Sequence, residues 1–145
     1  MVDVELVHLD RGLPLPERAM PDDAGLDLRA TEDVVLPAGG GRAVVGTGVA
    51  LALPPGWAGF VLPRSGLAIH HGVTCLNAPG LIDSGYRDEI KVILHNTDPL
   101  ADYLVQRGDR VAQLVVQGVD HVRWLVVDEL AGSERGKGGL GHSGR

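Results

Sequence analysis

The sequence predicts an all-β, jelly-roll-like fold, a barrel or sandwich made of about ten short strands. Three features of its 145 residues support this prediction. The apolar residues are mostly Val, Leu and Ala, and frequent valine favours strands. The 21 glycines and 9 prolines break the chain into short pieces. No stretch combines the length and the 3.6-residue period of a helix.

The first half of the chain contains five expected strands, each an apolar run closed by turn residues. Val2–Leu9 is followed by a glycine and two prolines, and Gly25–Leu28 is short and extended. Val34–Leu36 precedes a Pro-Ala-Gly-Gly-Gly turn. Ala43–Leu53 is rich in valine and stops at Pro-Pro-Gly, after which Trp57–Leu62 forms the next run.

The second half contains four more expected strands and a tail. Glu89–His95 alternates strictly, with Ile90, Val92 and Leu94 on one face and Lys91, Ile93 and His95 on the other. The expected strands that follow are Asp102–Gln106, Arg110–Gln117 and His121–Glu129. Residues 133–145 are rich in glycine and carry no strand pattern. We therefore expect one domain over residues 1–132 and a flexible C-terminal arm over 133–145.

Charge and composition restrict the partners. The formal net charge of −6 disfavours non-specific binding to nucleic acid or to an anionic membrane. A single cysteine, Cys75, excludes an intramolecular disulfide, and its apolar surroundings favour buried packing. The sequence has neither a run long enough to span a membrane nor a signal-peptide pattern. We expect a cytoplasmic protein with no nucleic-acid or membrane partner.

Two polar segments interrupt the first strands. Asp27 lies between two leucines, so a strand places its carboxylate on the opposite face, either as an exposed residue or as a functional group. In Pro63–Ala68, the backbone of Ser65 and Gly66 can turn N–H groups towards an anion. Arg64 adds a planar donor fork suited to phosphate. An ordinary turn with a solvated arginine is the alternative interpretation.

A third segment, residues 77–86, combines three kinds of chemistry on a Gly- and Pro-containing loop. The amide of Asn77 can read the edge of a base, and the ring of Tyr86 can pack under a sugar. The carboxylate of Asp83 can accept a proton from water. The alternative is a structural β-turn with a capping aspartate.

The last two segments carry cations and an amide. In residues 107–114 a turn leads into a strand from which Arg110 and Gln113 project, unless this is a hairpin with a salt bridge at its rim. Residues 135–144 are rich in glycine and contain two cations, which suits wrapping around phosphates as well as a disordered end. The segment lacks the order of a P-loop, GxxxxGK[ST].

Taken in order, the five segments resemble the five motifs of the trimeric dUTPase family. They read AGLDL at 24–28, PRSGLA at 63–68, NAPGLIDSGYRDEI at 77–90, RGDRVAQL at 107–114 and RGKGGLGHSG at 135–144. The resemblance implies a jelly-roll-like homotrimer with three shared active sites, each closed by the arm of one subunit. It implies Mg²⁺-dependent hydrolysis of dUTP to dUMP and pyrophosphate, which keeps uracil out of DNA and supplies dUMP for thymidylate synthesis.

The resemblance also assigns roles to individual residues. Asp83 is the expected general base, Arg110 supports the site wall and Asp83, and Asp27 holds Mg²⁺ through water while the ion rides mainly on substrate phosphates. Asn77 and the backbone of 81–83 would read uracil, and Tyr86 would exclude a 2′-hydroxyl. The expected substrate-binding residues are Arg64, Ser65, Gly66, Asn77, Leu81, Ile82, Asp83, Tyr86, Lys91, Gln113, Arg135, Leu140 and Gly141.

Three positions depart from the family pattern. Leu140 stands where a phenylalanine often stacks on uracil, so apolar cover is expected there without ring stacking. His142 and Ser143 replace a common Ser-Thr pair, and Asp88 replaces a glycine. These differences affect the lid and the base of the loop, not the reaction.

Other functions remain open at this point. A dCTP deaminase shares the fold and several motifs, but its catalytic glutamate corresponds here to Ile93, flanked by Lys91 and His95. A non-catalytic nucleotide-binding module would have no need of Asp83, and a purely structural jelly roll would not explain five ordered motifs. A zinc enzyme is disfavoured because the six histidines have no metal-ligand spacing and Cys75 stands alone.

Overall fold

Ten strands and one short helix make up the described part of the chain. A computed structural model describes residues 1–137. The all-β, jelly-roll-like prediction is confirmed. The elements are β1 (Glu5–His8), β2 (Leu26–Arg29), β3 (Val34–Leu36), β4 (Arg42–Ala52), β5 (Trp57–Leu62), α1 (Ser65–His71), β6 (Val73–Cys75), β7 (Gly80–Ile82), β8 (Glu89–Asn96), β9 (Tyr103–Val105) and β10 (Arg110–Gly118).

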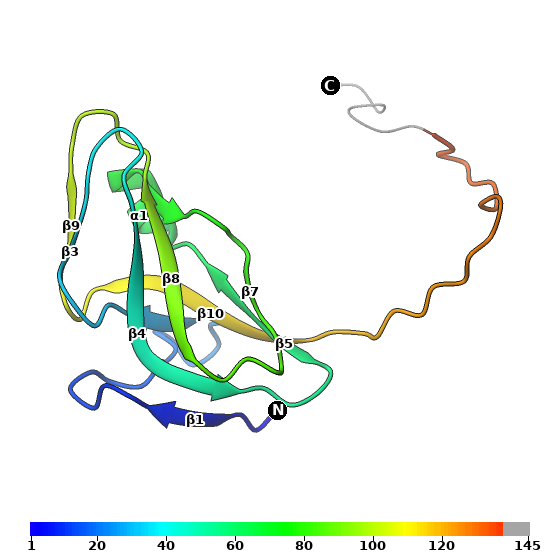
Figure 1. The fold of residues 1–145 in the computed structure, drawn as a ribbon, viewed down its shortest axis with the longest axis horizontal. Helices are drawn as coiled ribbons and strands as arrows, with labels where there is room; N and C mark the ends of the chain where they lie inside the picture. Colours follow the sequence, from blue (N-terminus) through cyan, green and yellow to red (C-terminus); the bar gives the residue numbers. More distant parts are fainter. Residues whose placement is uncertain (138–145) are drawn as a thin grey trace.

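Two four-stranded antiparallel sheets face each other across the core (Figure 1). The first has the order β1-β4-β8-β6 and the second the order β2-β10-β5-β7, while β3 and β9 pair separately. The alternation predicted for β8 is confirmed, because Ile90, Val92 and Leu94 are at most 1% exposed. Cys75 is also buried, as expected. The interior is therefore an apolar layer built from inward-facing residues of both sheets.

The loop between β6 and β7 crosses from one sheet to the other. β6 pairs with β8 in the first sheet, and β7 pairs with β5 in the second. Residues 77–86 were expected to form a loop or a hairpin. In the structure the first part of this segment bridges the two sheets, and Gly80–Ile82 continues as an edge strand. The crossing places the polar residues of the segment at an opening between the sheets.

The sequence did not reveal helix α1. It follows the Pro-Arg turn at once, and none of its side chains is buried. A helix of seven residues without an apolar stripe has no period that a sequence pattern can reveal. Its C-terminus is fixed by Gly72, whose φ of 63° is readily available only to glycine.

The predicted strand over His121–Glu129 is wrong. After Gly118 the chain runs extended and away from the barrel (Figure 1), so the expected domain boundary after residue 132 falls inside this extended segment. A strand needs a neighbour to accept and donate its backbone hydrogen bonds, and no described segment pairs with this one. Its apolar side chains are instead exposed, Trp124 by 83% and Val126 by 95%.

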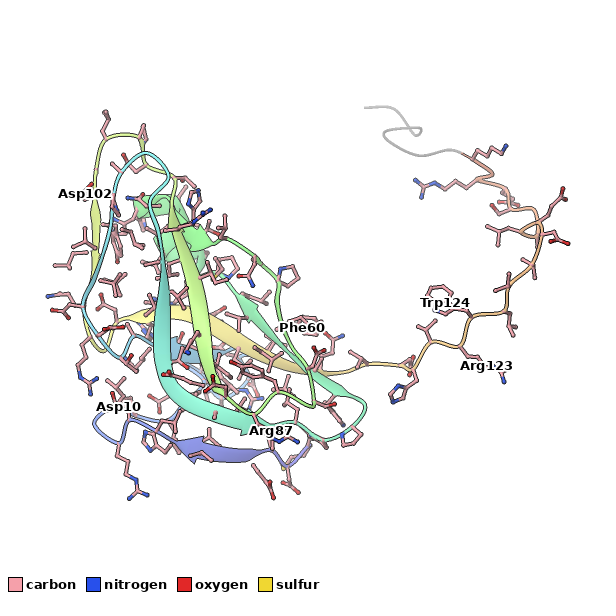
Figure 2. All side chains as sticks on the ribbon, viewed as in Figure 1. Asp10, Phe60, Arg87, Asp102, Arg123 and Trp124 are labelled. Carbon is pink, nitrogen blue, oxygen red and sulfur yellow. The ribbon has the colours of Figure 1, made fainter. Side chains whose placement is uncertain are left out.

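Figure 2 shows Arg123 and Trp124 on this outlying segment, well separated from the barrel. Among residues 1–137 no helix is long and apolar enough to cross a membrane.

Candidate active site

One pocket of about 300 Å³ gathers most of the residues expected to hold the nucleoside. It opens where the β6–β7 crossing meets the outer face of β4 and β8. Six of its lining residues were expected at the site from the sequence, namely Asn77, Leu81, Ile82, Asp83, Tyr86 and Lys91. The other four, Val44, Val61, Gly80 and Ile93, complete the wall.

The pocket has a polar end that is shaped by a glycine. A Cβ on Gly80 would lie 3.3 Å from Nδ2 of Asn77 and 3.3 Å from Cβ of Val61. The missing side chain therefore makes room for the Asn77 amide. That amide carries both a donor and an acceptor, which is the pair of groups needed to read the edge of a pyrimidine.

Tyr86 is held in place by its own hydroxyl. The hydroxyl donates to the backbone carbonyl oxygen of Glu89 at 2.8 Å, and the Tyr86 N–H donates to the carbonyl oxygen of Asp83 at 3.1 Å. The ring remains 38% exposed at the pocket wall. These two bonds fix the ring beside Asp83, which is exposed and, within residues 1–137, has no partner for its carboxylate. The carboxylate is thus available to a water molecule.

Asp88, which stands where the family pattern has a glycine, lies at the base of the same turn. Its Oδ1 accepts the backbone N–H of Glu89 at 2.7 Å. The carboxylate therefore caps the start of β8 next to the carbonyl that holds Tyr86, and it does not line the pocket.

A second group of charges, the arginine cluster of Asp27, Arg64 and Arg110, lies elsewhere in the chain. Asp27 is only 7% exposed, so the interpretation of this residue as an exposed strand aspartate is wrong. Its Oδ2 accepts Nη1 of Arg110 at 3.2 Å, and its Oδ1 lies 3.6 Å from Nε of Arg64. Arg64 also donates through Nη1 to the carbonyl oxygen of Arg110 at 2.9 Å.

The arginine cluster has a surplus of one positive charge, because two guanidinium groups share one carboxylate. Nε of Arg64 is buried and has no hydrogen-bond acceptor in the described structure. Both arginines also remain partly exposed, by 26% and 43%. A locally positive, partly dry surface attracts an anion, even on a protein of net charge −6.

Gln113, Ser65 and Gly66 border the arginine cluster. Gln113 pairs with Asp27 across β10 and β2, and a Cβ on Gly25 would lie 3.3 Å from its side chain. The glycine of the first motif therefore leaves space for the Gln113 amide. Ser65 and Gly66 are exposed in the first turn of α1, where backbone N–H groups lack intrahelical acceptors.

Asp83, at one side of the pocket, and Arg64, in the arginine cluster, lie at opposite ends of β5. Ile82 pairs with Gly59, so Asp83 comes beside Ala58. Arg64 follows six residues later along an extended chain, counting from 58 to 64. At about 3.3 Å per residue, the backbone of Arg64 lies roughly 20 Å from the end of β5 beside Asp83. One copy of the chain therefore does not bring its own Arg64 to its own Asp83.

The remaining expected residues lie in the C-terminal arm. Arg135 belongs to the segment that leads away from the barrel (Figure 1), in a turn closed by a bond from the Gly136 N–H to the Ser133 carbonyl oxygen at 3.0 Å. The positions expected to cover the base, Leu140 and Gly141, and the departures His142 and Ser143 lie outside the described residues.

Sequence reasoning missed the apolar wall of the pocket. Val44 and Ile93 lie directly opposite each other on the outer face of the β4–β8 pair. In the sequence they alternate with buried residues and look like ordinary solvent-facing positions. A pairing register, which the sequence does not contain, is needed to bring them to Asn77 and Asp83.

The resemblance of the five motifs implies Mg²⁺, and the donor set fits an ion carried by a phosphate-containing ligand. Among the described residues, no group of three or more His, Cys, Asp or Glu side chains could hold a metal. Asp27 offers a single buried carboxylate that is already flanked by arginines. Such a carboxylate suits an outer-sphere contact through water to an Mg²⁺ ion that keeps most of its ligands from water and phosphate.

These features define a class, an all-β, jelly-roll-like enzyme. A carboxylate, an amide and a ring share one pocket, and an anion-attracting arginine cluster lies apart from it. The dUTPase family model matches residues 11–144, and the chain belongs to the dUTPase family.

Relatives and solved structures agree with this placement. Deoxyuridine 5′-triphosphate nucleotidohydrolase of Thermobifida fusca is 57% identical over 143 residues, covering 99% of this chain and 79% of the relative. The dUTPase of Staphylococcus bacteriophage 80alpha with dUPNHPP superposes with a TM-score of 0.89 at 27% identity, and the match covers 100% of both chains. A mutant dUTPase of S. aureus phage phi11, described with a structural Mg(II) ion, has a TM-score of 0.77 at 25% identity, with 88% of this chain and 98% of that chain covered.

Proposed function

We propose that this chain hydrolyses dUTP to dUMP and pyrophosphate, with Mg²⁺ as cofactor. The observation that carries the proposal is the pocket that brings Asn77, Asp83 and Tyr86 together. Family membership and the nucleotidohydrolase relative support the same reaction. A cytoplasmic location stays a prediction.

Selection of deoxyuridine follows from the shape and the polar groups of the pocket. The amide of Asn77 and the backbone of Leu81 to Asp83 read the uracil edge. In this proposal the backbone of β7, an edge strand paired with β5, excludes the 5-methyl group of thymine. The fixed ring of Tyr86 packs against the deoxyribose and excludes a 2′-hydroxyl. Lys91, exposed at the pocket rim, is available to the substrate as well.

Asp83 is the general base in this proposal. Its unpartnered carboxylate orients a water molecule and removes its proton as the oxygen attacks the α-phosphorus. Reaction requires the water to lie in line with the leaving pyrophosphate oxygen, and positioning of this kind supplies much of the catalysis of phosphoryl transfer. The leaving group keeps most of the negative charge, which the cations around it must stabilise.

The triphosphate is held by Arg64, Gln113, the first turn of α1 and, from the arm, Arg135. Guanidinium groups bind phosphate oxygens through two parallel hydrogen bonds. Mg²⁺, when bound, would neutralise charge on the phosphate oxygens and contact Asp27 through water. Leu140 and Gly141 would cover the base from the arm, and Arg110 would hold Asp27 and Arg64 in place.

A shared site in a homotrimer reconciles the two separated groups. Because Asp83 and Arg64 of one chain lie at opposite ends of β5, the phosphate ligands near Asp83 must come from another copy. The extended segment after Gly118 supports assembly too, since it exposes Val122, Trp124 and Val126, which a neighbouring subunit would cover. The arm leaves the barrel from the end of β10 that lies beside Ala58, close to Asp83.

A dCTP deaminase remains the competing function, and one position argues against it. Ile93 occupies the wall where that family carries its catalytic glutamate, and it is an apolar, partly buried side chain. An apolar side chain can neither give nor take a proton at the pyrimidine ring.

A pyrophosphate-release assay tests the proposal, with dUTP, dTTP, UTP and dCTP compared with and without Mg²⁺. We expect release from dUTP alone, and loss of it when Mg²⁺ is chelated. Ammonia release from dCTP would instead establish deamination.

The role of Asp83 is tested by Asp83→Asn, which should lower kcat by about 10²- to 10⁴-fold while dUTP still binds. Asp88→Asn is the matched control, because it changes an exposed carboxylate five positions away that does not line the pocket. Near-normal turnover of the Asp83 variant would remove this residue from the mechanism.

A further inference from the structure

Two aliphatic side chains, Val44 and Ile93, stand together on the outer face of the β4–β8 pair. They lie directly opposite each other, and Val44 is 57% exposed. The cross-strand pairs on either side are polar or lack a side chain, namely Arg42 with His95 and Gly46 with Lys91. When one face of an antiparallel sheet packs on the core, the other face is normally polar. An aliphatic pair at this position therefore indicates that an apolar group covers it.

The aliphatic pair adjoins the polar end of the pocket. The backbone N–H of Leu76 donates to the carbonyl oxygen of Ile93 at 2.8 Å, and Asn77 is the next residue along the chain. Val44, Ile93 and Asn77 line the same pocket. Whatever group the Asn77 amide reads therefore lies beside the aliphatic pair.

Strand β8 separates the two ends of the pocket. The hydroxyl of Tyr86 is bonded to the carbonyl oxygen of Glu89, and Ile93 follows four residues later on the same strand, counting from 89 to 93. At about 3.3 Å per residue, these two points of β8 lie roughly 13 Å apart. A nucleoside whose sugar packs against Tyr86 therefore extends its base towards the aliphatic pair.

A pyrimidine ring needs two kinds of contact. Its polar edge requires hydrogen bonds, whereas its flat faces are apolar and are matched by the hydrophobic walls that make up most of a ligand pocket. Among the described residues, Tyr86 is the one ring that lines this pocket, and the sugar occupies it. The face of the base is left to aliphatic side chains.

We propose that Val44 and Ile93 bind one face of the uracil ring and thereby contribute to substrate affinity. Both residues lie outside the five motifs. The inference rests on the proposed function for the identity of the base.

The test compares Val44→Ala with the wild-type enzyme. Losing apolar contact in the pocket should raise KM for dUTP and the inhibition constant of deoxyuridine by the same factor, about tenfold. The kcat should change little, because the contact is the same in the ground state and in the transition state. Tripolyphosphate has no base, so it should inhibit both proteins equally.

Val35→Ala is the matched control. Val35 is also an outward-facing strand valine, 55% exposed and directly opposite an exposed aliphatic residue, Leu104 of β9, but it does not line the pocket. Its truncation should leave KM for dUTP and the deoxyuridine constant unchanged. An equal rise in both constants for Val35→Ala would overturn the inference.

A neighbouring copy of the chain is the alternative cover for the aliphatic pair, and light scattering separates the two. If Val44→Ala lowers the molar mass at the assay concentration and KM recovers at higher protein concentration, the inference is overturned. Contact with the base is also observed directly in the wild-type protein, where nuclear Overhauser effects should connect the H5 and H6 protons of deoxyuridine to the Val44 methyl groups. Their absence with deoxyuridine bound would contradict the proposal.

Failure of this inference differs from failure of the proposed function. A wild-type chain that does not hydrolyse dUTP would refute the proposed function. An active wild type with unchanged constants in Val44→Ala would refute this inference alone.

Discussion

Two inactive variants of this chain should restore each other's activity when their subunits are mixed. Asp83→Asn removes the proposed base, and Arg64→Ala removes a proposed phosphate ligand at the opposite end of β5. If every active site takes its Asp83 and its Arg64 from different copies, a mixed oligomer contains some sites in which both residues are native. If one copy supplied both residues, each site would carry one of the two lesions and mixing would restore nothing.

The size of the effect follows from the structure. Pairing of Ile82 with Gly59 places Asp83 beside Ala58, roughly 20 Å from the Arg64 backbone. Reacting and stabilising groups must lie within about 3–3.5 Å of the atoms they act on, so the two residues of one chain cannot serve the same phosphate chain. In a random one-to-one mixture each residue is native with a probability of one half, and about one quarter of the sites are complete.

The assay is pyrophosphate release from dUTP after the two variants are unfolded together in urea and refolded. Each variant refolded alone gives the background, and wild-type protein treated identically gives the full scale. Recovery of about a quarter of wild-type turnover is expected. Turnover that stays at the background level, with mixed oligomers demonstrated by two different affinity tags, would refute the shared site.

Three further outcomes follow from individual contacts. Gly80→Ala places a methyl group 3.3 Å from the Asn77 amide, so KM for dUTP should rise several-fold with little change in kcat, measured by steady-state kinetics. Asn96→Ala leaves three backbone groups without the hydrogen bonds that the fully buried Asn96 amide provides. Urea unfolding should show that the free energy of unfolding falls by about 2–3 kcal/mol. Burial raises the pKa of Cys75 to about 11, so a thiol reagent at pH 8 should react with it only after unfolding.

Much of the fold was predictable because the strands of this protein obey a simple rule. Where one face of a strand is buried, the residues alternate, and Ile90, Val92 and Leu94 show this directly. The rule fails for residues 121–129, which have the apolar content of a strand but no described neighbour to pair with. It fails for α1 as well, since a helix that buries no side chain leaves no period in the sequence. Both failures involve the absence of a packing partner.

The candidate site was predictable in composition but not in arrangement. The polar segments identified Asn77, Asp83 and Tyr86, and the pocket brings them together. The sequence contained no information on which end of β5 each segment reaches, because this depends on the pairing of β7 with β5. The same register places Asp83 at the end of β5 opposite Arg64, and this separation is the physical reason to expect an oligomer.

The burial of Asp27 explains how an acidic protein can bind a polyanion. Two arginines side by side repel each other, and a buried carboxylate between them reduces this repulsion and fixes their orientation. The carboxylate is only 7% exposed, so it neutralises one charge without presenting a negative surface to the nucleotide. What reaches the surface is a cluster with one positive charge in surplus and with its guanidinium groups already oriented. A net charge of −6 spread over the rest of the chain then keeps other polyanions away, while the site itself remains attractive to a triphosphate.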